Sequence, residues 1–415
     1  MYNWRGKKLL VLGATKIIGE IVDAAHRYGA HVIVADYNPD APAKKIADES
    51  VLLNVMDVDA VVNYVREHNV DGIITGFTDI LMLPYVKICE RTGHHCCLNA
   101  QMVAQTTDKA MFKKLCHDFD INTVQEFDDV DKMTYPVLVK PVDNSGSRGI
   151  YICNNRAEYD VAVANALRFS NSRHILTERY ITLPEATVFY VFDNGMAHMT
   201  AMADRHVTQI RDDILRLPSG YTFPSVGTEN FMAHSDKKFQ SMFAHMGIKN
   251  GMIFIQGFLD ENNEFIPYEC GLRLTGSLEY KLIERVCGYN PLSMLINYAF
   301  CGSMTARDEI SHINPLHATH AYNISVLIRP GKISEISGVD EIRNTRNVLD
   351  VFLSYDIGDE LGEESWGRLS QVAVRIFFVS ENAQEYQSTI NIIKNNLKIL
   401  DENGNDMILT KEIVI

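Results

Sequence analysis

The chain has 415 residues, more than one hydrophobic core usually serves, so its length predicts roughly two to four domains. Hydrophobic residues make up 46% of the chain and charged residues 22%, which is an ordinary soluble globular composition. The formal net charge of −14 excludes an extended basic surface, so we expect neither nucleic acid nor an anionic membrane among the partners.

The cysteine pattern indicates a reducing compartment. The eight cysteines contain no C-x-x-C pair, and the sequence shows neither a secretory signal nor a transmembrane span, so we expect a cytoplasmic protein. The run His94-His95-Cys96-Cys97 resembles a metal cluster, but successive side chains of a strand point to opposite faces. We therefore interpret it as a partly buried strand rather than as a zinc site.

The first hundred residues alternate between strand and helix. We expect strands at residues 9–12, 32–35 and 72–75, and helices at 17–28, 57–68 and 81–92. Such alternation predicts a parallel, doubly wound sheet with ligands outside the carboxyl ends of its strands.

Two loops of this sheet are candidate ligand edges. Residues 13–19 follow the first strand and Asp36 ends the second, as in dinucleotide-binding folds, but Thr15 and Ile18 break the G-x-G-x-x-G pattern. A dehydrogenase is therefore a weak alternative. Residues 75–79 form a plausible substrate edge, although plain turn chemistry explains them slightly better.

A helix is expected from Asp108-Lys109 onward, with Thr107 as its cap. Its apolar face would carry Met111, Leu115 and Phe119, with Phe112 and Cys116 beside them. Lys109 lies in the first turn, where the helix dipole disfavours a cation, and a bound anion would explain it.

The most distinctive stretch runs through residues 135–151. An apolar strand at 137–139 ends at Lys140, a loop of small residues at 143–149 follows, and a second apolar run begins at Ile150. Small residues let backbone N–H groups approach a phosphate, and the lysine supplies charge. The loop joins two strands and is not a Walker A loop; the alternative is a glycine-serine hairpin with a surface lysine.

Two carboxylates then flank an apolar pair. A strand at 174–178 ends in Glu178-Arg179-Tyr180-Ile181, and Glu185 precedes another strand at 186–192. The apolar pair could contact a nucleoside base while one acid binds the ribose hydroxyls.

Residues 251–276 predict a hairpin, with strands at 253–259 and 264–269 and a turn at Asn262-Asn263. If Glu261 faces Glu264, Gln256 lies directly opposite Glu269, and Gly271 and Arg273 continue the same face. Gln, Glu and Arg on one face suit a divalent cation beside a phosphate, whereas the alternative is a solvated polar face.

The last hundred residues are expected to form a separate unit. Hairpins are predicted for 321–328 with 332–336, across Pro330-Gly331, and for 397–400 with 407–410, across Asn403-Gly404. A strand at 372–379 and a helix at 382–396 complete it, and it shows no catalytic constellation.

In their order and spacing, these motifs resemble the ATP-grasp superfamily of carboxylate–amine ligases, in particular its carbamoyl-phosphate-synthase-large-chain-like and L-amino-acid-ligase-like members. The resemblance implies an α/β and α+β multidomain fold with an N-terminal Rossmann-like, pre-ATP-grasp parallel sheet. It implies an N-terminal domain at 1–105, an ATP-grasp lid subdomain at 106–185, a catalytic subdomain at 186–315 and a C-terminal α+β domain at 316–415.

The resemblance also assigns roles to residues. It implies ATP binding by Lys109, Leu138, Lys140, Ser145, Gly146, Ser147, Glu178, Arg179, Tyr180, Ile181, Glu185 and Phe258. The loop 144–149 would be the family's flap, Gln256 and Glu269 the metal ligands, and Arg273 and Lys140 the catalytic residues. Asp204-Arg205-His206 follows a predicted strand, and we expect Arg205 and His206 to contact substrate together with Arg273.

The implied activity is ATP-dependent joining of a small carboxylate to an amine through an acyl phosphate, with Mg²⁺ (Mn²⁺ can substitute) and a homodimer as a further possibility. Gln256 replaces the family's usual carboxylate and Gly271 its usual asparagine, which predicts one dominant magnesium site on Glu269. The alternative is a degenerate ATP-binding sensor or scaffold that does not ligate.

Overall fold

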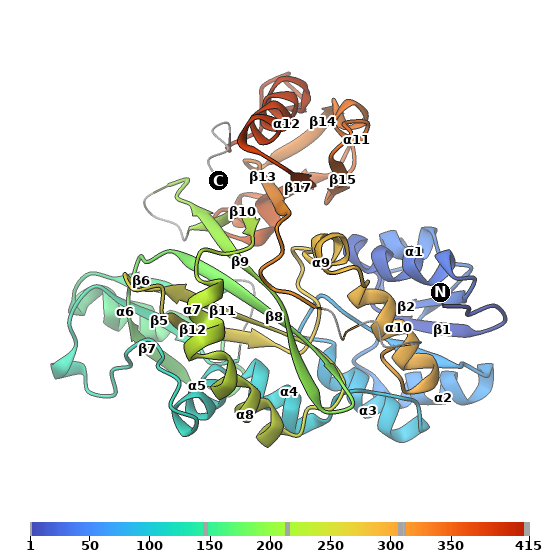
Figure 1. The fold of residues 1–415 in the computed structure, drawn as a ribbon, viewed down its shortest axis with the longest axis horizontal. Coiled ribbons are helices and arrows are strands. Elements are labelled where there is room, and N and C mark those ends of the chain that lie inside the picture. The colour runs from blue at the N-terminus through green and yellow to red at the C-terminus, as the bar shows by residue number, and fades with distance from the viewer. Residues whose placement is uncertain (1, 144–147, 212–215, 306–309, 311–312, 411–415) are drawn as a thin grey trace.

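Three lobes make up the computed structural model, which describes residues 2–143, 148–211, 216–305, 310 and 313–410 (Figure 1). The N-terminal lobe holds a four-stranded sheet, a second lobe combines a three-stranded sheet with most of an eight-stranded sheet, and the C-terminal lobe extends that large sheet. In the described part of the chain, no helix has the length and apolar character needed to cross a membrane.

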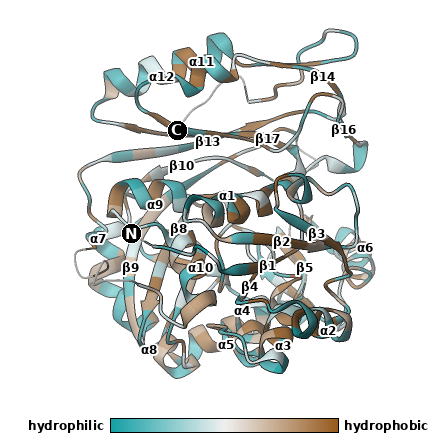
Figure 2. Ribbon diagram, turned by 90° about the vertical axis from the view of Figure 1, so that its right-hand side faces the viewer, coloured by the Kyte–Doolittle hydropathy of each residue, from teal (hydrophilic) through white to brown (hydrophobic). Residues whose placement is uncertain are grey.

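The N-terminal sheet is parallel throughout, as predicted, and its strand order is β3-β2-β1-β4. Its strands are β1 (Lys8–Leu12), β2 (His31–Asp36), β3 (Glu49–Leu52) and β4 (Gly72–Ile74), and its helices α1 (Gly19–Arg27), α2 (Val58–His68) and α3 (Met82–Thr92). Figure 2 shows its hydrophobic strands between helices on both sides. Strand β3, an edge strand of four residues that is mostly exposed, was not predicted from the sequence.

The two helices that follow correct two predictions. Helix α4 (Ala100–Thr107) contains Thr107, and the carboxylate of Asp108 caps α5 (Lys109–Asp118) by accepting from the Met111 N–H at 2.9 Å. Met111 is 42% exposed, so the buried face of α5 is made by its neighbours Phe112, Leu115 and Cys116.

The predicted strand at His94-His95-Cys96-Cys97 is also wrong. These residues form an irregular connection, because Gly93 ends α3 in the left-handed conformation and Asn99 already caps α4. The His94 ring is held by the Thr92 hydroxyl at 2.8 Å and the Val70 carbonyl at 2.9 Å. These contacts give the ring a structural role.

The small antiparallel sheet has the order β6-β5-β7. It consists of β5 (Val137–Pro141), β6 (Tyr151–Cys153) and β7 (Ile175–Arg179), with α6 (Arg156–Ala166) packed against it. Val137 pairs with Cys153, so the prediction that the loop of small residues joins two strands is confirmed.

The eight-stranded sheet has the order β12-β11-β8-β9-β10-β13-β17-β15 and holds the lobes together. Its strands are β8 (Glu185–Asp193), β9 (Met196–Thr208), β10 (Leu217–Phe223), β11 (Gly251–Leu259), β12 (Phe265–Gly271), β13 (His320–Leu327), β15 (Val348–Leu353) and β17 (Val372–Ser380). Helices α7 (Thr228–His234) and α8 (Asp236–Met246) pack on one face, and α9 (Tyr280–Cys287) and α10 (Pro291–Cys301) on the other. Residues 204–206 lie inside β9, so the prediction that they follow a strand is wrong.

Helix α10 also covers the N-terminal sheet. Adding a Cβ to Gly72 of β4 would bring it to 2.9 Å from the Phe300 ring, and the Trp4 indole donates to Asn297 at 3.2 Å. The N-terminal lobe is therefore packed directly against the lobe that carries the large sheet.

The C-terminal lobe adds a second small sheet, in the order β16-β14-β18. Its elements are β14 (Gly331–Ser337), α11 (Val339–Arg343), β16 (Glu360–Leu361), α12 (Ala383–Asn396) and β18 (Lys398–Asp401). The predicted hairpin across Pro330-Gly331 is wrong. Gly331, with φ 144°, leads the chain out of the large sheet, so β13 and β14 belong to different sheets.

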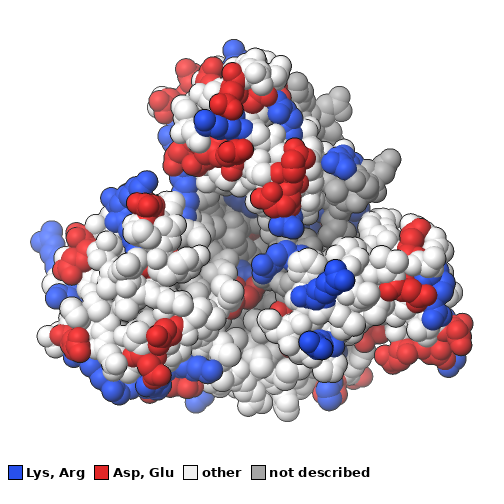
Figure 3. Space-filling model, turned by 180° about the vertical axis from the view of Figure 1, so that it is seen from behind, with Lys and Arg blue, Asp and Glu red and all other residues white. Residues whose placement is uncertain are grey.

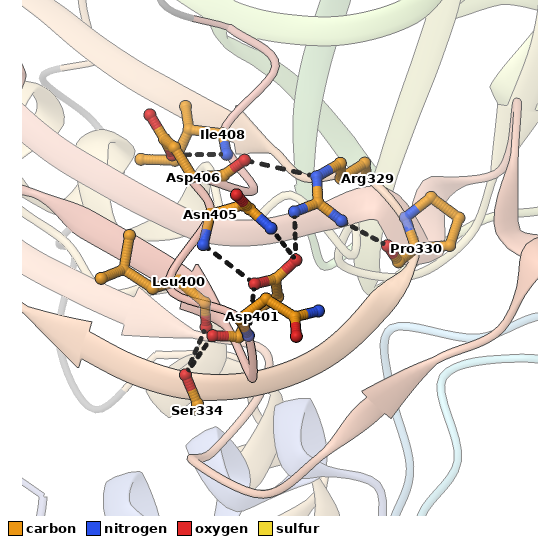
Figure 4. Close-up of polar contacts among 9 residues, drawn as sticks. Arg329, Pro330, Ser334, Leu400, Asp401, Asn405, Asp406 and Ile408 are labelled. Atoms are coloured by element: carbon orange, nitrogen blue, oxygen red, sulfur yellow. Dashed lines mark hydrogen bonds and ion pairs between the residues drawn. The ribbon is translucent and has the colours of Figure 1, made fainter.

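The turn at Asn403-Gly404 is confirmed, and Asp401 organises it (Figure 4). Its carboxylate accepts from the backbone N–H groups of Asn403 at 2.8 Å and Asn405 at 2.9 Å, and from the Arg329 guanidinium at 2.6 Å. Hydrogen bonds from Arg329 and these N–H groups hold the pKa of Asp401 well below its usual range. The described residues also form short 3-10 turns at Lys16–Ile18, Pro42–Lys45, Val130–Lys132, Glu363–Ser365 and Leu369–Gln371.

Candidate functional site

Two adjoining pockets lie on the face of the large sheet that also carries α9 and α10. The lid pocket, of about 210 Å³, lies between the small antiparallel sheet and the strands β8, β9, β11 and β12. The central pocket, of about 440 Å³, is bounded by all three lobes. Seen from behind, the molecule is hollowed where the lobes meet, with basic and acidic side chains visible inside (Figure 3).

The lid pocket brings together nine of the twelve residues predicted to bind ATP. They are Lys109, Leu138, Lys140, Glu178, Arg179, Tyr180, Ile181, Glu185 and Phe258. The other three, Ser145, Gly146 and Ser147, lie outside the described residues.

A buried charge cluster forms the floor of the lid pocket. Lys140 is 4% exposed and Glu178 2% exposed, and their side chains form an ion pair at 2.6 Å. Lys113, which is 1% exposed, binds the same Glu178 carboxylate at 2.7 Å and Glu126 at 2.6 Å. Burial acts to raise the pKa of Glu178, but the two ammonium groups outweigh it and the pKa is lowered.

Sequence reasoning missed Lys113. It lies one helical turn after Lys109 on α5, so a four-residue spacing of lysines pointing to one face was the available signal. Burial lowers the pKa of Lys140, and the Glu178 carboxylate opposes this effect. Lys140 therefore lines the lid pocket with an ammonium group that is already paired with the Glu178 carboxylate.

The opposite wall is built around Glu185. Its carboxylate accepts a short hydrogen bond from the Arg205 guanidinium and a 2.9 Å bond from the Tyr268 hydroxyl. The Tyr268 ring lies 4.9 Å from the Phe258 ring, so an apolar surface faces Leu138 across the pocket. A flat apolar group fits between these walls, with Glu185 near its polar edge.

The predicted pairing of Gln256 with Glu269 is confirmed, although the turn and the strand register that lead to it differ from the prediction. Asp260, rather than Glu261, faces Glu264, because the Asp260 carboxylate and backbone N–H both bond to Glu264 and close a three-residue turn at 261–263, one residue longer than predicted. A β-bulge next to Gln256 then restores the register. Gln256 and Glu269 line both pockets and so stand at their junction.

Comparison with known proteins agrees with this geometry. A family model described as the ATP-grasp domain matches residues 133–280, which include the lid strands and the Gln256–Glu269 hairpin. Residues 133–280 are thus an ATP-grasp domain.

Among curated relatives, the chain is 26% identical over 189 residues to the formate-dependent phosphoribosylglycinamide formyltransferase of Bacillus subtilis (strain 168), covering 42% of this chain and 49% of the relative. The same enzyme of Prochlorococcus marinus (strain MIT 9301) is 29% identical over 153 residues, covering 34% and 39%. The chain thus spans about half or less of the length of these relatives.

Among solved structures, L-amino acid ligase from Bacillus licheniformis matches with a TM-score of 0.78 at 19% identity, covering 96% of this chain and 100% of that one. Phosphoribosylglycinamide synthetase from Anaerococcus prevotii matches with a TM-score of 0.74 at 18% identity, covering 95% and 100%. At these identities the likeness is one of fold, and it confirms the predicted ATP-grasp architecture with its N-terminal parallel sheet.

Arg273 of the ATP-grasp domain has contacts on two sides that fix its orientation. Asp79 binds its Nε and Nη2 atoms at 2.5 and 2.6 Å, and the guanidinium carbon lies 5.1 Å above the Phe254 ring. Asp79 belongs to the loop at residues 75–79, where sequence reasoning slightly favoured plain turn chemistry and so undervalued this contact.

Phe254 also accounts for the unusual Gly271. The two residues are paired across β11 and β12, and a Cβ at position 271 would lie 2.6 Å from the Phe254 ring. Phe254 therefore fills the space that an asparagine at position 271 would need. Position 271 is therefore a glycine because the Phe254 ring leaves no room for a side chain there.

The residues at the junction fit one magnesium ion. Glu269 supplies a carboxylate and Gln256 an amide oxygen, and Mg²⁺ commonly takes one or two protein carboxylates and completes its shell with phosphates and water. Within the described residues, no group of three His, Cys, Asp or Glu side chains is arranged to hold a metal. Gly271 has no side chain, so it supplies no ligand for a second ion.

Of the three residues predicted to contact substrate, two line the central pocket and one does not. Arg205 and Arg273 line the central pocket. His206, next to Arg205 in β9, lines neither the central nor the lid pocket, and its Nε2 atom pairs with the Thr222 hydroxyl at 2.8 Å. Burial lowers the pKa of His206, which favours a neutral ring.

Proposed function

We propose that this ATP-grasp protein is an ATP-dependent ligase that joins a small carboxylate to an amine, forming an amide or peptide bond. One observation carries the proposal: the lid pocket and the central pocket meet at Gln256 and Glu269, with Arg273 beside them. A nucleotide in the first pocket would direct its terminal phosphate toward a substrate in the second.

The proposed reaction has two steps. A carboxylate oxygen of the substrate attacks the γ-phosphorus of ATP, the bond to the bridging oxygen breaks, and ADP leaves an acyl phosphate. The amine nitrogen then attacks the acyl carbon, the carbon–oxygen bond to phosphate breaks, and the amine proton passes to solvent. The protein contributes mainly by positioning the reactants and neutralising charge.

The lid pocket supplies the nucleotide contacts. Leu138, Ile181 and Phe258 offer an apolar slot for the base, Glu185 an acceptor for the ribose hydroxyls, and Lys109 and Lys140 charge for the phosphates. Magnesium held by Glu269 with Gln256 would neutralise phosphate oxygens when bound.

Arg273 is suited to the phosphoryl group in transfer. Three of its N–H groups are used by Asp79 and by the Leu274 carbonyl, and a guanidinium has five. The remaining two can donate to a phosphoryl or acyl-phosphate oxygen. Because Asp79 fixes the orientation of the side chain, little reorganisation is needed during the reaction.

A substrate screen tests the proposal. Pairs of carboxylates and amines, beginning with amino acids because of the likeness to an L-amino acid ligase, are assayed for ADP release with Mg²⁺ or Mn²⁺. An active pair is then run with an ¹⁸O-labelled carboxylate, and the label should appear in inorganic phosphate. Nucleotide binding without ADP release from any pair would favour the sensor or scaffold alternative.

A further inference from the structure

Four cationic side chains are among the described residues that line the central pocket, and three of them already have acidic partners. Lys16 pairs with Asp356, Arg205 with Glu185 and Arg273 with Asp79. The fourth is Arg375 of β17, for which no carboxylate of the described chain lies within 4.0 Å.

Arg375 is a buried cation. Arg375 is only 6% exposed, and its Nη1 atom donates to the Ser325 hydroxyl at 2.7 Å. Its other N–H groups have no protein acceptor among the described residues, and they border the central pocket. A buried guanidinium is costly unless it is paired, so this arrangement is suited to a ligand that brings the missing negative charge.

Glu279 acts electrostatically on Arg375 but forms no ion pair with it. It is 1% exposed, one oxygen accepts a short hydrogen bond from the Thr275 hydroxyl, and the other has no partner among the described residues. Burial raises the pKa of Glu279 and so favours its neutral form. Tyr221 and Arg205 also face Arg375, and the Arg205 charge adds to the positive character of the pocket.

Strand register places Arg375 far from the reacting end of the pocket. In the strand register, Arg205 lies opposite Tyr221, Tyr221 opposite Asn323, and Ser325 opposite Arg375. Asn323 and Ser325 are two residues apart on β13 and so lie on the same face. Gln256 shares that face, because Arg205 lies opposite Glu185, and Glu185 opposite Phe258, two residues from Gln256. Gln256 is on β11, and β8, β9, β10 and β13 lie between it and the strand of Arg375. An anion bound by Arg375 would therefore be remote from a carboxylate at Arg273.

We propose that Arg375 determines substrate specificity by binding a second anionic group, a carboxylate or a phosphate, at the end of the substrate opposite the reacting carboxylate. This inference rests on the proposed ligase function and narrows its substrate class to elongated dianions. Ser325 acts as a positioning residue for the guanidinium.

Binding of simple probes tests the inference without knowledge of the natural substrate. Linear dicarboxylates and phosphonocarboxylates of increasing length are titrated, with monocarboxylates of equal length, into protein saturated with Mg²⁺ and a non-hydrolysable ATP analogue. We expect at least one dianion to bind roughly 10- to 100-fold more tightly than its monoanion. The better of the two dianion series distinguishes a carboxylate from a phosphate.

Three variants assign that preference to Arg375. Arg375→Gln should remove it, Arg375→Lys should retain part of it, and Ser325→Ala should weaken it. Arg156→Gln changes an exposed arginine of α6 and should have no effect. Unchanged affinity for the ATP analogue shows that each variant is folded, and Arg375→Lys keeps the test valid if the glutamine variant does not fold.

The outcomes separate the two proposals. Failure of the wild-type protein to bind the nucleotide analogue would contradict the ligase function itself. Normal nucleotide binding with no preference for any dianion, or a preference that persists in Arg375→Gln, would overturn only the role of Arg375.

Discussion

The lid pocket and the central pocket differ in how the chain builds them. The lid pocket draws most of its lining from three short stretches, at residues 138–150, 178–185 and 256–269. The central pocket takes residues from the N-terminal loops, the large sheet and the C-terminal strands, between Thr15 and Arg375. The first pocket could be predicted from local patterns, whereas the second exists only once the lobes are packed together.

The largest effect is expected from the buried cluster beneath the lid pocket. Lys113→Met removes a buried ammonium that binds both Glu178 and Glu126, and breaking such a pair typically costs about 3–5 kcal/mol of folding stability. The free energy of unfolding in urea measures the loss.

The adjacent lysine is a matched control. Lys114 pairs with Asp118 on the exposed side of α5, so Lys114→Met should cost less than about 0.5 kcal/mol. Equal destabilisation by the two substitutions would show that the cluster around Glu178 does not carry the expected stability.

The junction of the two pockets should control turnover. Glu269→Gln removes the only carboxylate of the proposed magnesium pair and should lower the rate of ADP release by roughly 10²- to 10³-fold, as loss of a charge-stabilising group does. Gln256→Glu adds a carboxylate opposite Glu269 and should tighten metal binding without abolishing turnover.

Titration of activity with Mg²⁺ compares the two variants. Full activity of Glu269→Gln at all metal concentrations would contradict the assignment of the hairpin as the metal site. Two equally tight ions bound by protein ligands alone would contradict the single site.

Packing around Arg273 gives a smaller expected effect. Gly271→Ala places a methyl group 2.6 Å from the Phe254 ring and should destabilise the protein by about 1–3 kcal/mol, measured by thermal or urea unfolding. Combining it with Phe254→Leu should recover part of the loss, because the smaller side chain makes room. A neutral Gly271→Ala would show that Phe254 moves aside easily.

The smallest expected effect is on pH dependence. The pKa of Glu178 is lowered from its ordinary value of 4.5, so its contribution to stability is present above that value and is lost as pH falls through the folded-state pKa. Glu178→Gln should therefore show a weaker loss of unfolding free energy than the wild type between neutral pH and pH ~3. Identical slopes for the two proteins would indicate that Glu178 titrates as it does when unfolded.

The sequence predicted local features well, because hydrophobic periodicity and the residue preferences of turns depend only on neighbouring residues. The pairing of Gln256 with Glu269 was recoverable from the hairpin pattern, although the longer turn after Asp260 and the compensating bulge were not. The sequence could also have indicated that Lys113 lies near Lys109, because the two lysines are four residues apart on α5.

The missed features depend on contacts between distant segments. Asp79 meets Arg273 only because the N-terminal lobe packs against the large sheet, and no short pattern marks that contact. β13 and β14 have the sequence of a hairpin across Pro330-Gly331, yet β13 continues the large sheet beside β10. That pairing brings β17, and with it Arg375, to the central pocket.

The most direct test of nucleotide binding in the lid pocket is a calorimetric titration of Mg·ATP into the wild type, Lys140→Ala and the exposed lid variant Lys132→Ala. We expect the wild type and Lys132→Ala to bind equally, and Lys140→Ala to lose roughly 1.5–3 kcal/mol of affinity with its charge-assisted phosphate contact. Unchanged affinity in Lys140→Ala, with the fold intact, would contradict ATP binding in the lid pocket.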